Sequence, residues 1–239
     1  PGFFHKDMEV SQLPKWVKTA KLYSTSNKKY IDYLICNDAA TLIYMANLGC
    51  IEINPWNSVY TKPDYPDYMI LDLDPGNIGF KEVVKTALVI KEICDEIGAS
   101  SYCKTSGSTG LHIYLPLKGK YDYDQVKVFG QIFAEAVNSR LPDITSTERT
   151  ISKRKDKIYI DYLQNRKGQT IAAPYSVRPR PYATVSTPLL WKEVNESLSP
   201  TDFTINNVKK RLDRKGDLWK GVLGPAIPML KVLKKLEKL

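Results

Sequence analysis

The 239-residue sequence lacks several features that would place it in common protein classes. It has no run of about 18 apolar residues, the length that a membrane-spanning helix needs, and no apolar secretory signal at its N-terminus. Its four cysteines form no C-x-x-C pair and it has only two histidines, so neither a structural zinc site nor a disulfide framework is predicted. We therefore expect a cytoplasmic protein with free thiols.

Basic residues are abundant. The chain has 35 Lys and Arg against 26 Asp and Glu, a formal net charge of +9. This charge favours a polyanionic partner such as nucleic acid or nucleotide phosphates, although solubility alone is an alternative explanation. Hydrophobic residues make up 43% and charged residues 26%. This ordinary mixture predicts a single folded domain with appendages rather than a disordered chain.

The spacing of apolar residues predicts both helices and strands. Apolar positions three and four residues apart predict amphipathic helices near 80–97 and 123–139. A shorter helix is expected over 38–47, and strands are expected over 30–35, 50–53, 68–74, 101–104, 111–115, 158–163 and 170–173. Because many of these segments are joined by short loops, the expected class is α+β, with mixed, largely antiparallel sheets flanked by helices. The Lys-rich tail, about 199–239, is predicted to be a solvent-exposed helical appendage.

Asp72 and Asp74 stand together at the end of an apolar strand. Residues two apart on a strand project from the same face, so both carboxylates are expected to point the same way. A third aspartate, Asp161, lies on another apolar strand, where an isolated charge is costly. Because hard divalent cations prefer carboxylate ligands, the three aspartates predict a two-metal site for phosphoryl or nucleotidyl transfer. The alternative is that Asp72 and Asp74 cap the turn at 75–76.

A loop of small residues, SGSTGLH at 106–112, leads into the next strand. Its glycines allow backbone N–H groups to approach phosphate oxygens, and the hydroxyls and His112 add further donors. The loop is not a P-loop, because the pattern G-x-x-x-x-G-K-[ST] is absent. An anion-binding loop and an ordinary turn both remain open.

Guanidinium groups are concentrated around Asp161. They belong to Arg149, Arg154, Arg166, Arg178 and Arg180. Arginine makes forked contacts with phosphates, so some of these residues are expected to hold a triphosphate or a nucleic-acid backbone. Prolines follow both Arg178 and Arg180, and such a preset extended backbone suits a binding element.

Four sequence blocks together resemble the polymerase domain of bacterial DNA ligase D, a member of the archaeo-eukaryotic primase superfamily. The blocks are DLDP from residue 72, KTSGSTGLHIYLPL from 104, YIDYLQN from 159 and APYSVRPRPYATVSTPLLW from 173. Their order and approximate spacing agree along most of the chain, from the FFHK segment at 3–6 to the GDLW segment at 216–219. The resemblance implies a primase-like catalytic core.

The resemblance also implies an activity. Members of the family add ribo- or deoxyribonucleotides to a DNA 3′ end during gap filling and non-homologous end joining, with two Mn²⁺ or Mg²⁺ ions as cofactors. The implied partners are DNA ends with a 5′-phosphate, primer-template DNA, NTP or dNTP, the end-binding protein Ku and a DNA ligase. No membrane partner is implied, and the expected location is the nucleoid in the cytoplasm.

Particular residues match the family motifs. The implied catalytic and metal-binding residues are Asp72, Asp74 and Asp161. The implied nucleotide-binding residues are Ser106, Gly107, His112, Arg154, Arg178 and Asn54, and the implied DNA-binding residues are Lys6, Phe4 and Arg180.

The sequence departs from the family pattern in three places. We expect residues 1–239 to be one catalytic domain that lacks its N-terminal portion, where the family carries lysines that grip the 5′-phosphate. Ser108 and Thr109 stand where many relatives have a lysine, which leaves fewer cations for the triphosphate. Asn54 stands where the family usually has histidine; asparagine donates a hydrogen bond but carries no positive charge.

Two other functions are compatible with parts of the pattern. A phosphohydrolase of the haloacid dehalogenase type also has a D-x-D at the end of an apolar strand, and Asp72 would then be a nucleophile. Its signature normally continues with Thr or Val, whereas Pro75 follows here. The second alternative is a non-catalytic module that binds DNA ends through the basic surface.

Overall fold

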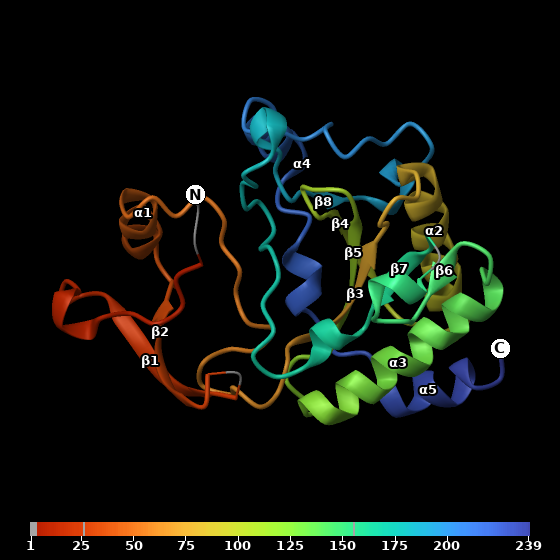
Figure 1. Ribbon diagram of the computed structural model, residues 1–239, viewed down its shortest axis with the longest axis horizontal. Helices are drawn as coiled ribbons and strands as arrows, with labels where there is room; N and C mark the ends of the chain where they lie inside the picture. The colour runs from red at the N-terminus through yellow and green to blue at the C-terminus, as the bar shows by residue number, and fades with distance from the viewer. Residues whose placement is uncertain (1–3, 26, 155) are drawn as a thin grey trace.

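The computed structural model describes residues 4–25, 27–154 and 156–239, so Phe3 of the FFHK segment lies outside the described residues. Figure 1 shows a small N-terminal lobe beside a larger lobe that contains most of the chain. The described residues form a two-stranded sheet, a six-stranded sheet and five α-helices. The fold is α+β, as the sequence predicts.

The N-terminal lobe is a hairpin with one helix. Strands β1 (Lys18–Ser24) and β2 (Lys29–Ile35) pair antiparallel, and helix α1 spans Ala39–Asn47. The Asp38 carboxylate caps α1 by accepting a hydrogen bond from the Thr41 N–H at 2.7 Å. The predicted strand over 30–35 and helix over 38–47 are confirmed.

The larger lobe is built on the six-stranded sheet. Its strands, in spatial order, are β6 (Thr145–Ser146), β7 (Ile158–Asp161), β3 (Tyr68–Asp74), β5 (Leu111–Pro116), β4 (Tyr102–Thr105) and β8 (Pro188–Leu189). All neighbours run antiparallel except β6 and β7, which are parallel. β3 is therefore a central strand, with the end of β7 on one side and β5 on the other.

Helices cover one face of this sheet (Figure 1), whereas the other face is only partly covered, by a small apolar cluster that includes Ile70, Ile171 and Val222. The helices are α2 (Phe80–Ile97), α3 (Tyr123–Arg140) and α5 (Met229–Leu236). Along β3, alternate residues Met69, Leu71 and Leu73 are fully buried in the core beneath these helices. Because strand side chains alternate between faces, Asp72 and Asp74 project from the opposite face.

The C-terminal tail differs from the expected exposed appendage. Met229, Val232 and Leu236 of α5 are buried in the main core, whereas α4 (Val208–Lys215) has no buried residue. The α5 sequence is Lys-rich, but its apolar residues recur every three to four positions and make one buried face. Only α4 matches the expected solvent-exposed helix.

Two predicted strands are wrong. Residues 50–53 and 170–173 form no strand and belong to neither sheet. They lie alongside each other through single contacts, with the Ala173 N–H donating to the Ile53 carbonyl at 2.9 Å and an isolated bridge between Trp56 and Thr170. Contacts this sparse do not make a strand ladder.

Short 3₁₀ turns complete the chain. They are η1 (Val10–Gln12), η2 (Ile151–Lys153), η3 (Leu163–Asn165), η4 (Pro181–Ala183), η5 (Trp191–Glu193) and η6 (Lys220–Leu223). All four cysteines are free thiols. Among the described residues, no helix combines the length and apolarity that crossing a membrane requires.

Candidate active site

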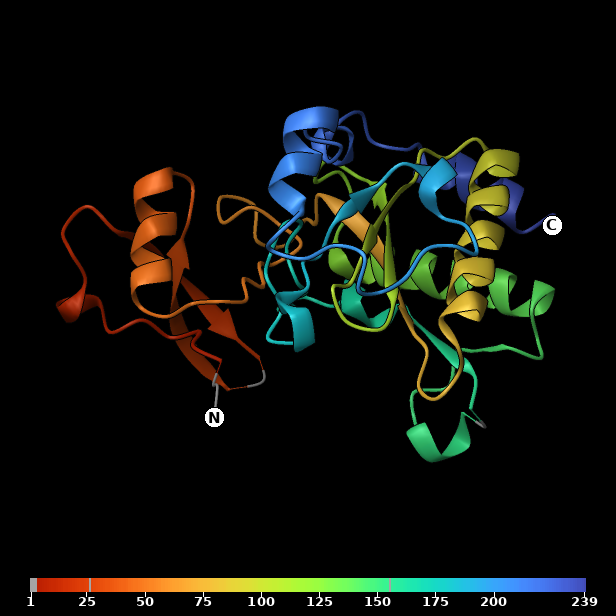
Figure 2. The same ribbon diagram turned by 90° about the horizontal axis from the view of Figure 1, so that it is seen from above.

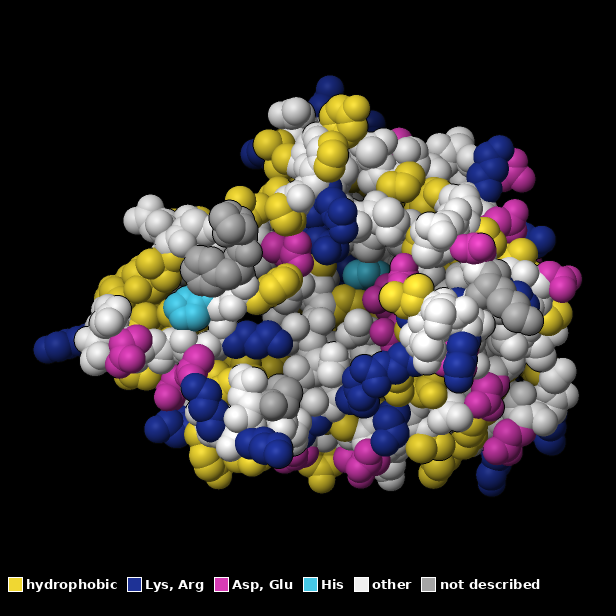
Figure 3. Space-filling model, viewed as in Figure 1, with side chains coloured by type: hydrophobic (Ala, Val, Ile, Leu, Met, Phe, Trp, Pro, Cys, Tyr) yellow, Lys and Arg dark blue, Asp and Glu magenta, His cyan; other side chains and the backbone are white. Residues whose placement is uncertain are grey.

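A row of polar side chains crosses the face of the main sheet that the helices leave uncovered. Asp72 on β3 lies opposite Asp161 on β7 and, on its other side, opposite His112 on β5. His112 in turn lies opposite Lys104 on β4. Directly opposed residues have Cβ atoms about 4.5–5.5 Å apart, so the register alone brings the four side chains together. Figure 3 shows histidine, acidic and basic side chains gathered in a hollow at the middle of this face.

Asp74 lies on the same face as Asp72 but makes a different contact. Its Oδ2 accepts a hydrogen bond from an Arg154 Nη at 3.2 Å. Arg154 also donates to the carbonyls of Glu148 at 3.0 Å and Arg149 at 2.8 Å, and its guanidinium stacks on the Tyr159 ring. Arg154 therefore joins the segment before β7 to the third carboxylate.

The pKa of Asp72 is raised to about 7. Burial is the main cause, and the neighbouring carboxylates of Asp161 and Asp74 add to it, while Lys104 and Arg178 oppose it. Burial also raises the pKa of Asp161, although hydrogen bonds from the Leu163 N–H (2.8 Å) and the Tyr159 hydroxyl (3.1 Å) oppose this shift. Burial and mutual repulsion therefore destabilise the ionised form of these two carboxylates unless a cation is bound.

These carboxylates fit a divalent cation by their chemistry. Asp72 and Asp161 face each other across two strands and offer the hard oxygen donors that Mg²⁺ and Mn²⁺ prefer. No group of three His, Cys, Asp or Glu side chains in the described part of the chain is already gathered as a metal site. Asp74, which the sequence places beside Asp72, is instead paired with Arg154.

His112 is held between Asp72 and a buried lysine. Its Nε2 lies 3.4 Å from Asp72 Oδ1, and its Nδ1 lies 2.9 Å from the Nζ of Lys104. Burial, together with the charges of Lys104 and Arg178, lowers the pKa of His112 well below its usual value, so the imidazole is neutral. When Lys104 is protonated its ammonium can only donate, so Nδ1 then accepts from Lys104 and Nε2 carries the proton.

Sequence reasoning gave Lys104 no role. The side chain is fully buried and also donates to the Ser186 hydroxyl at 2.6 Å. Burial lowers the pKa of Lys104 to about 7, whereas the nearby Asp72 carboxylate raises it. No local pattern marks this role, because the partner Ser186 is 82 positions away.

The 106–110 loop is closed by its own hydrogen bonds. The Ser106 hydroxyl accepts from the backbone N–H groups of Ser108 and Gly110, each at 3.0 Å. Gly107 has a φ of +69°, and a Cβ there would lie 2.7 Å from Arg178 Cγ. A Cβ on Gly110 would lie 2.1 Å from the Leu73 carbonyl oxygen. The glycines therefore allow this loop to pack tightly against β3 and Arg178.

Arg178 and Asn54 are brought together by a residue that sequence reasoning missed. The Arg178 Nε donates to Glu52 at 2.7 Å, and another Arg178 nitrogen donates to the Ser106 carbonyl at 2.5 Å. The Asn54 amide donates to the other oxygen of Glu52 at 3.1 Å. Glu52 thus holds Arg178 beside the 106–110 loop and offsets part of its charge. No local pattern marks this contact, since Glu52 and Arg178 are 126 positions apart.

Two of the three predicted DNA-binding residues, Phe4 and Lys6, line a cavity apart from the three aspartates. Phe4 is 77% exposed, and with Lys6 it lines a cavity of about 460 Å³ that also includes Trp56 and Lys167. None of the three aspartates lines this cavity. Arg180 is exposed beyond Arg178.

Comparison with protein families and curated proteins gives one consistent match. The family model of the LigD primase-polymerase domain matches residues 1–219. The bifunctional non-homologous end joining protein LigD of Bacillus subtilis is 36% identical over 77% of this chain, which covers 30% of that protein. The multifunctional non-homologous end joining protein LigD of Pseudomonas aeruginosa is 31% identical over 73% of this chain, which covers 21% of that protein. The chain thus spans less than a third of the length of these relatives.

A solved structure also matches the fold. It is the polymerase domain from Mycobacterium tuberculosis ligase D in complex with DNA. The TM-score is 0.85 at 27% sequence identity, and the match covers 95% of this chain and 81% of that one. The similarity therefore includes both lobes.

Proposed function

The chain belongs to the family of LigD primase-polymerase domains, and from this premise we propose that it is a primase-polymerase type, DNA-directed nucleotidyltransferase. Its substrates are NTP or dNTP and a DNA 3′ end, in gap filling and non-homologous end joining. The observation that carries the proposal is the polar row in which Asp161, Asp72 and His112 occupy opposed positions on three adjacent strands. We propose that residues 1–239 form a single catalytic domain.

Asp72 and Asp161, with Asp74 as a third donor, would hold two Mn²⁺ or Mg²⁺ ions. Such ions, when bound, activate the attacking 3′-hydroxyl and stabilise the leaving oxygen. The raised pKa of Asp72 supports this assignment, because a carboxylate destabilised by burial and by like charges gains most from a cation. Asp74 shares its carboxylate with Arg154, so that ion pair competes with any cation for the same oxygens.

The side chains beside the acids suit a triphosphate. The neutral His112 presents its Nε2–H toward Asp72, and Arg178 is fixed beside the 106–110 loop by Glu52. We assign His112, Arg154 and Arg178 to the triphosphate. The small loop residues Ser106 and Gly107 would allow close approach, while Asn54 orients Glu52. Arginine donors placed before the reaction stabilise charge that develops on phosphate oxygens.

Larger partners follow from the relatives. Those proteins are named for non-homologous end joining, and the solved relative is in complex with DNA. For this chain we propose primer-template DNA and ends with a 5′-phosphate as substrates, Ku and a DNA ligase as partners, and the nucleoid as the place of action. Phe4, Lys6 and Arg180 are assigned to DNA contacts.

Primer extension tests the proposed function. With Mn²⁺ and NTP, the protein is expected to extend a recessed DNA primer, and Asp72→Asn and Asp161→Asn are each expected to abolish extension while DNA binding persists. Asp95→Asn serves as the control, because Asp95 is an exposed aspartate of α2 paired with Lys91. Extension at the wild-type rate by either site variant contradicts the assignment.

The same preparation separates the alternatives. Phosphorylation of Asp72 without nucleotide or primer would favour the phosphohydrolase. DNA binding by the wild-type protein with no extension under any metal would favour the non-catalytic module.

A further inference from the structure

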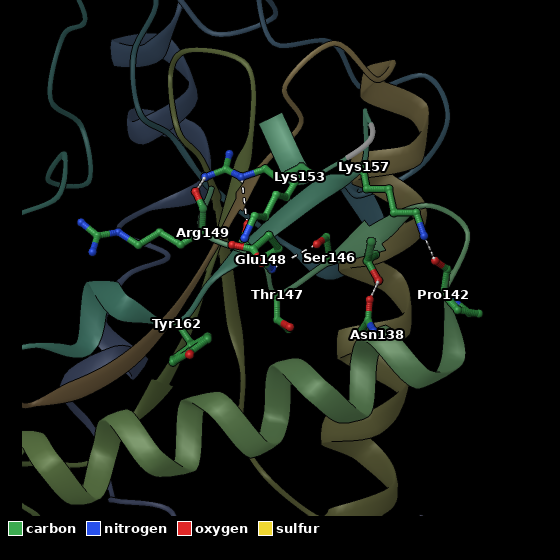
Figure 4. Close-up of a pocket in the computed structure, with 11 residues that line it drawn as sticks. Asn138, Pro142, Ser146, Thr147, Glu148, Arg149, Lys153, Lys157 and Tyr162 are labelled. Carbon is green, nitrogen blue, oxygen red and sulfur yellow. Dashed lines mark hydrogen bonds between the residues drawn. The ribbon is translucent and has the colours of Figure 1, made fainter. Parts of the chain in front are cut away.

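A second hollow opens beside the acids, at the β6–β7 edge of the sheet. It has a volume of about 560 Å³ and lies between the end of α3 and the segment that leads to β7 (Figure 4). Its lining residues are Asn138, Pro142, Thr145, Ser146, Thr147, Glu148, Arg149, Lys153, Arg154, Lys157 and Tyr162. None of these except Arg154 has a role in the function proposed above.

The lining of this cavity is strongly basic. Its described residues contribute four cationic side chains, from Arg149, Lys153, Arg154 and Lys157, against the single carboxylate of Glu148. The Glu148 carboxylate is already engaged, because it accepts a hydrogen bond from the Thr150 N–H at 2.8 Å. Arg149 and Lys153 are exposed, so both remain open to solution. Such a lining suits an anion with several charges.

Two lining residues connect the cavity to the acid cluster. Arg154 lines the cavity and also donates to Asp74, and Tyr162, another lining residue, directly follows Asp161. The segment before β7 is further joined to the loop after β3, since the Asn77 amide donates to Asp156 at 3.0 Å. Figure 2 shows these two segments projecting side by side from the larger lobe.

Strand order places this cavity on the other side of Asp72 from His112 and Arg178. These two of the three side chains assigned to the triphosphate lie toward β5, β4 and β8, whereas the third, Arg154, lies at the boundary between the acids and the cavity. The cavity lies in the other direction, beyond Asp161, toward β7 and β6. In phosphoryl and nucleotidyl transfer the attacking and leaving oxygens are roughly in line. With the leaving group held by His112 and Arg178, an in-line hydroxyl approaches from the β7 side.

We propose that this cavity binds the sugar-phosphate backbone at the 3′ end of the DNA strand that is extended. The inference rests on the proposed function. Arg149 and Lys153 contact the last phosphodiesters of that strand, and these contacts direct its terminal hydroxyl toward Asp72 and Asp161. Contacts to phosphates fix the register and orientation of a strand without reading its bases. Tyr162 is the one aromatic side chain among the described residues that line the cavity, which suits backbone rather than base recognition.

A binding experiment without chemistry tests this assignment. Fluorescence anisotropy measures the affinity for primer-template DNA of the wild-type protein and of the double variant Arg149→Ala/Lys153→Ala. Each protein is also measured with a primer whose two 3′-terminal linkages are neutral methylphosphonates. We expect the double variant to bind the ordinary primer roughly five- to thirtyfold more weakly, because two exposed charge contacts are lost. Neutral linkages are expected to weaken the wild-type protein but not the double variant, since both changes remove the same contacts.

The control is Lys85→Ala/Lys127→Ala, which removes the same charge from α2 and α3 on the covered face of the sheet. It is expected to show the full methylphosphonate effect. Three results overturn the assignment. The cavity variant could bind the ordinary primer as tightly as the wild-type protein does, or neutral linkages in the primer could weaken both proteins equally. The third is that the variant becomes insensitive to neutral linkages in the template strand instead of those in the primer. The assignment is also overturned if inorganic pyrophosphate displaces a bound ligand from the wild-type protein but not from the cavity variant while DNA affinity is unchanged. Because binding needs no turnover, an inactive wild-type protein would contradict the proposed function and leave this test intact.

Discussion

At the scale of single residues, the site depends on charges that are costly to bury. Asp72 and Lys104 are two strands apart, and each shifts the pKa of the other toward its ordinary value. His112 lies between them and remains neutral. The neighbours of a buried ionisable group therefore decide its protonation state and its hydrogen bonds.

Lys104→Met is expected to disturb His112 without touching substrate. The variant removes the donor to Nδ1, so the proton of His112 is no longer confined to Nε2. We expect the KM for nucleotide to rise about tenfold with a smaller change in kcat, because residues that orient a binding histidine through a hydrogen bond typically have effects of this size when removed. Nitrogen NMR of the two histidines in the chain reads the tautomer directly. Lys120→Met, at an exposed lysine, is the control; an unchanged His112 tautomer in Lys104→Met contradicts this role.

Asp72 is expected to make the metal-free protein less stable as the pH rises. Its pKa is raised from 3.8 to about 7 in the folded state, so between these values the folded protein binds more protons than the unfolded chain. The free energy of unfolding therefore falls through this window, by an amount on the order of a few kcal/mol for this group. Urea unfolding at several pH values measures it, with Asp72→Asn as the reference. We expect the stability of the wild-type protein relative to Asp72→Asn to decrease from pH 4 to pH 7; a constant difference contradicts the shift.

At the scale of elements, β3 depends on a side chain that replaces a strand. β7 ends at Asp161, opposite Asp72, and leaves the inner part of β3 without a neighbour on that side. The Asn165 amide occupies this position: its oxygen accepts from the Ile70 N–H at 2.8 Å and its nitrogen donates to the Ile70 carbonyl at 2.7 Å. One amide thus satisfies both backbone groups of a buried residue.

Asn165→Ala is expected to lower the free energy of unfolding by about 3–5 kcal/mol. The substitution leaves two buried backbone groups of Ile70 without partners, each at about 1–3 kcal/mol. Urea denaturation measures the change, with Asn195→Ala, an exposed asparagine in a turn, as the control. A loss below about 1 kcal/mol would mean that water replaces the amide.

Local sequence predicted the elements with strong periodicity and missed what joins them. The alternation along β3 and the apolar spacing of α2 and α3 located these elements closely, because one face of each is buried. The strand expected over 158–163 stops at Asp161, because the Leu163 N–H turns back to its carboxylate. The contacts of Glu52 with Arg178 and of Asn165 with Ile70 connect positions about 100 residues apart. No periodic pattern encodes such pairs.

At the scale of the molecule, the basic residues behind the net charge of +9 differ in whether an acidic side chain pairs with them. Many basic residues are paired with acids on the surface, such as Lys167 with Asp64 and Arg140 with Glu96. The basic cavity beside the acids has four described cationic side chains against one carboxylate, and Lys6 lines the second hollow, where Lys29 is paired with Asp7. Both are placed to meet DNA phosphates.

DNA binding is therefore expected to depend steeply on salt. Each phosphate contact to duplex DNA contributes about −0.9 to the slope of log K against log salt concentration. Anisotropy titrations from about 50 to 200 mM salt measure the slope. A slope near zero contradicts a backbone-binding surface.

The packing of α5 also affects where this protein can be cut. The family match ends before α5, yet Ile227, Met229, Val232 and Leu236 fill the core beneath the main sheet, and the Lys235 ammonium caps the Ile97 carbonyl at the end of α2. A fragment trimmed to the matched region would uncover that apolar surface on α2 and α3. Such a fragment would keep every proposed catalytic residue and still aggregate, so its inactivity would say nothing about the chemistry.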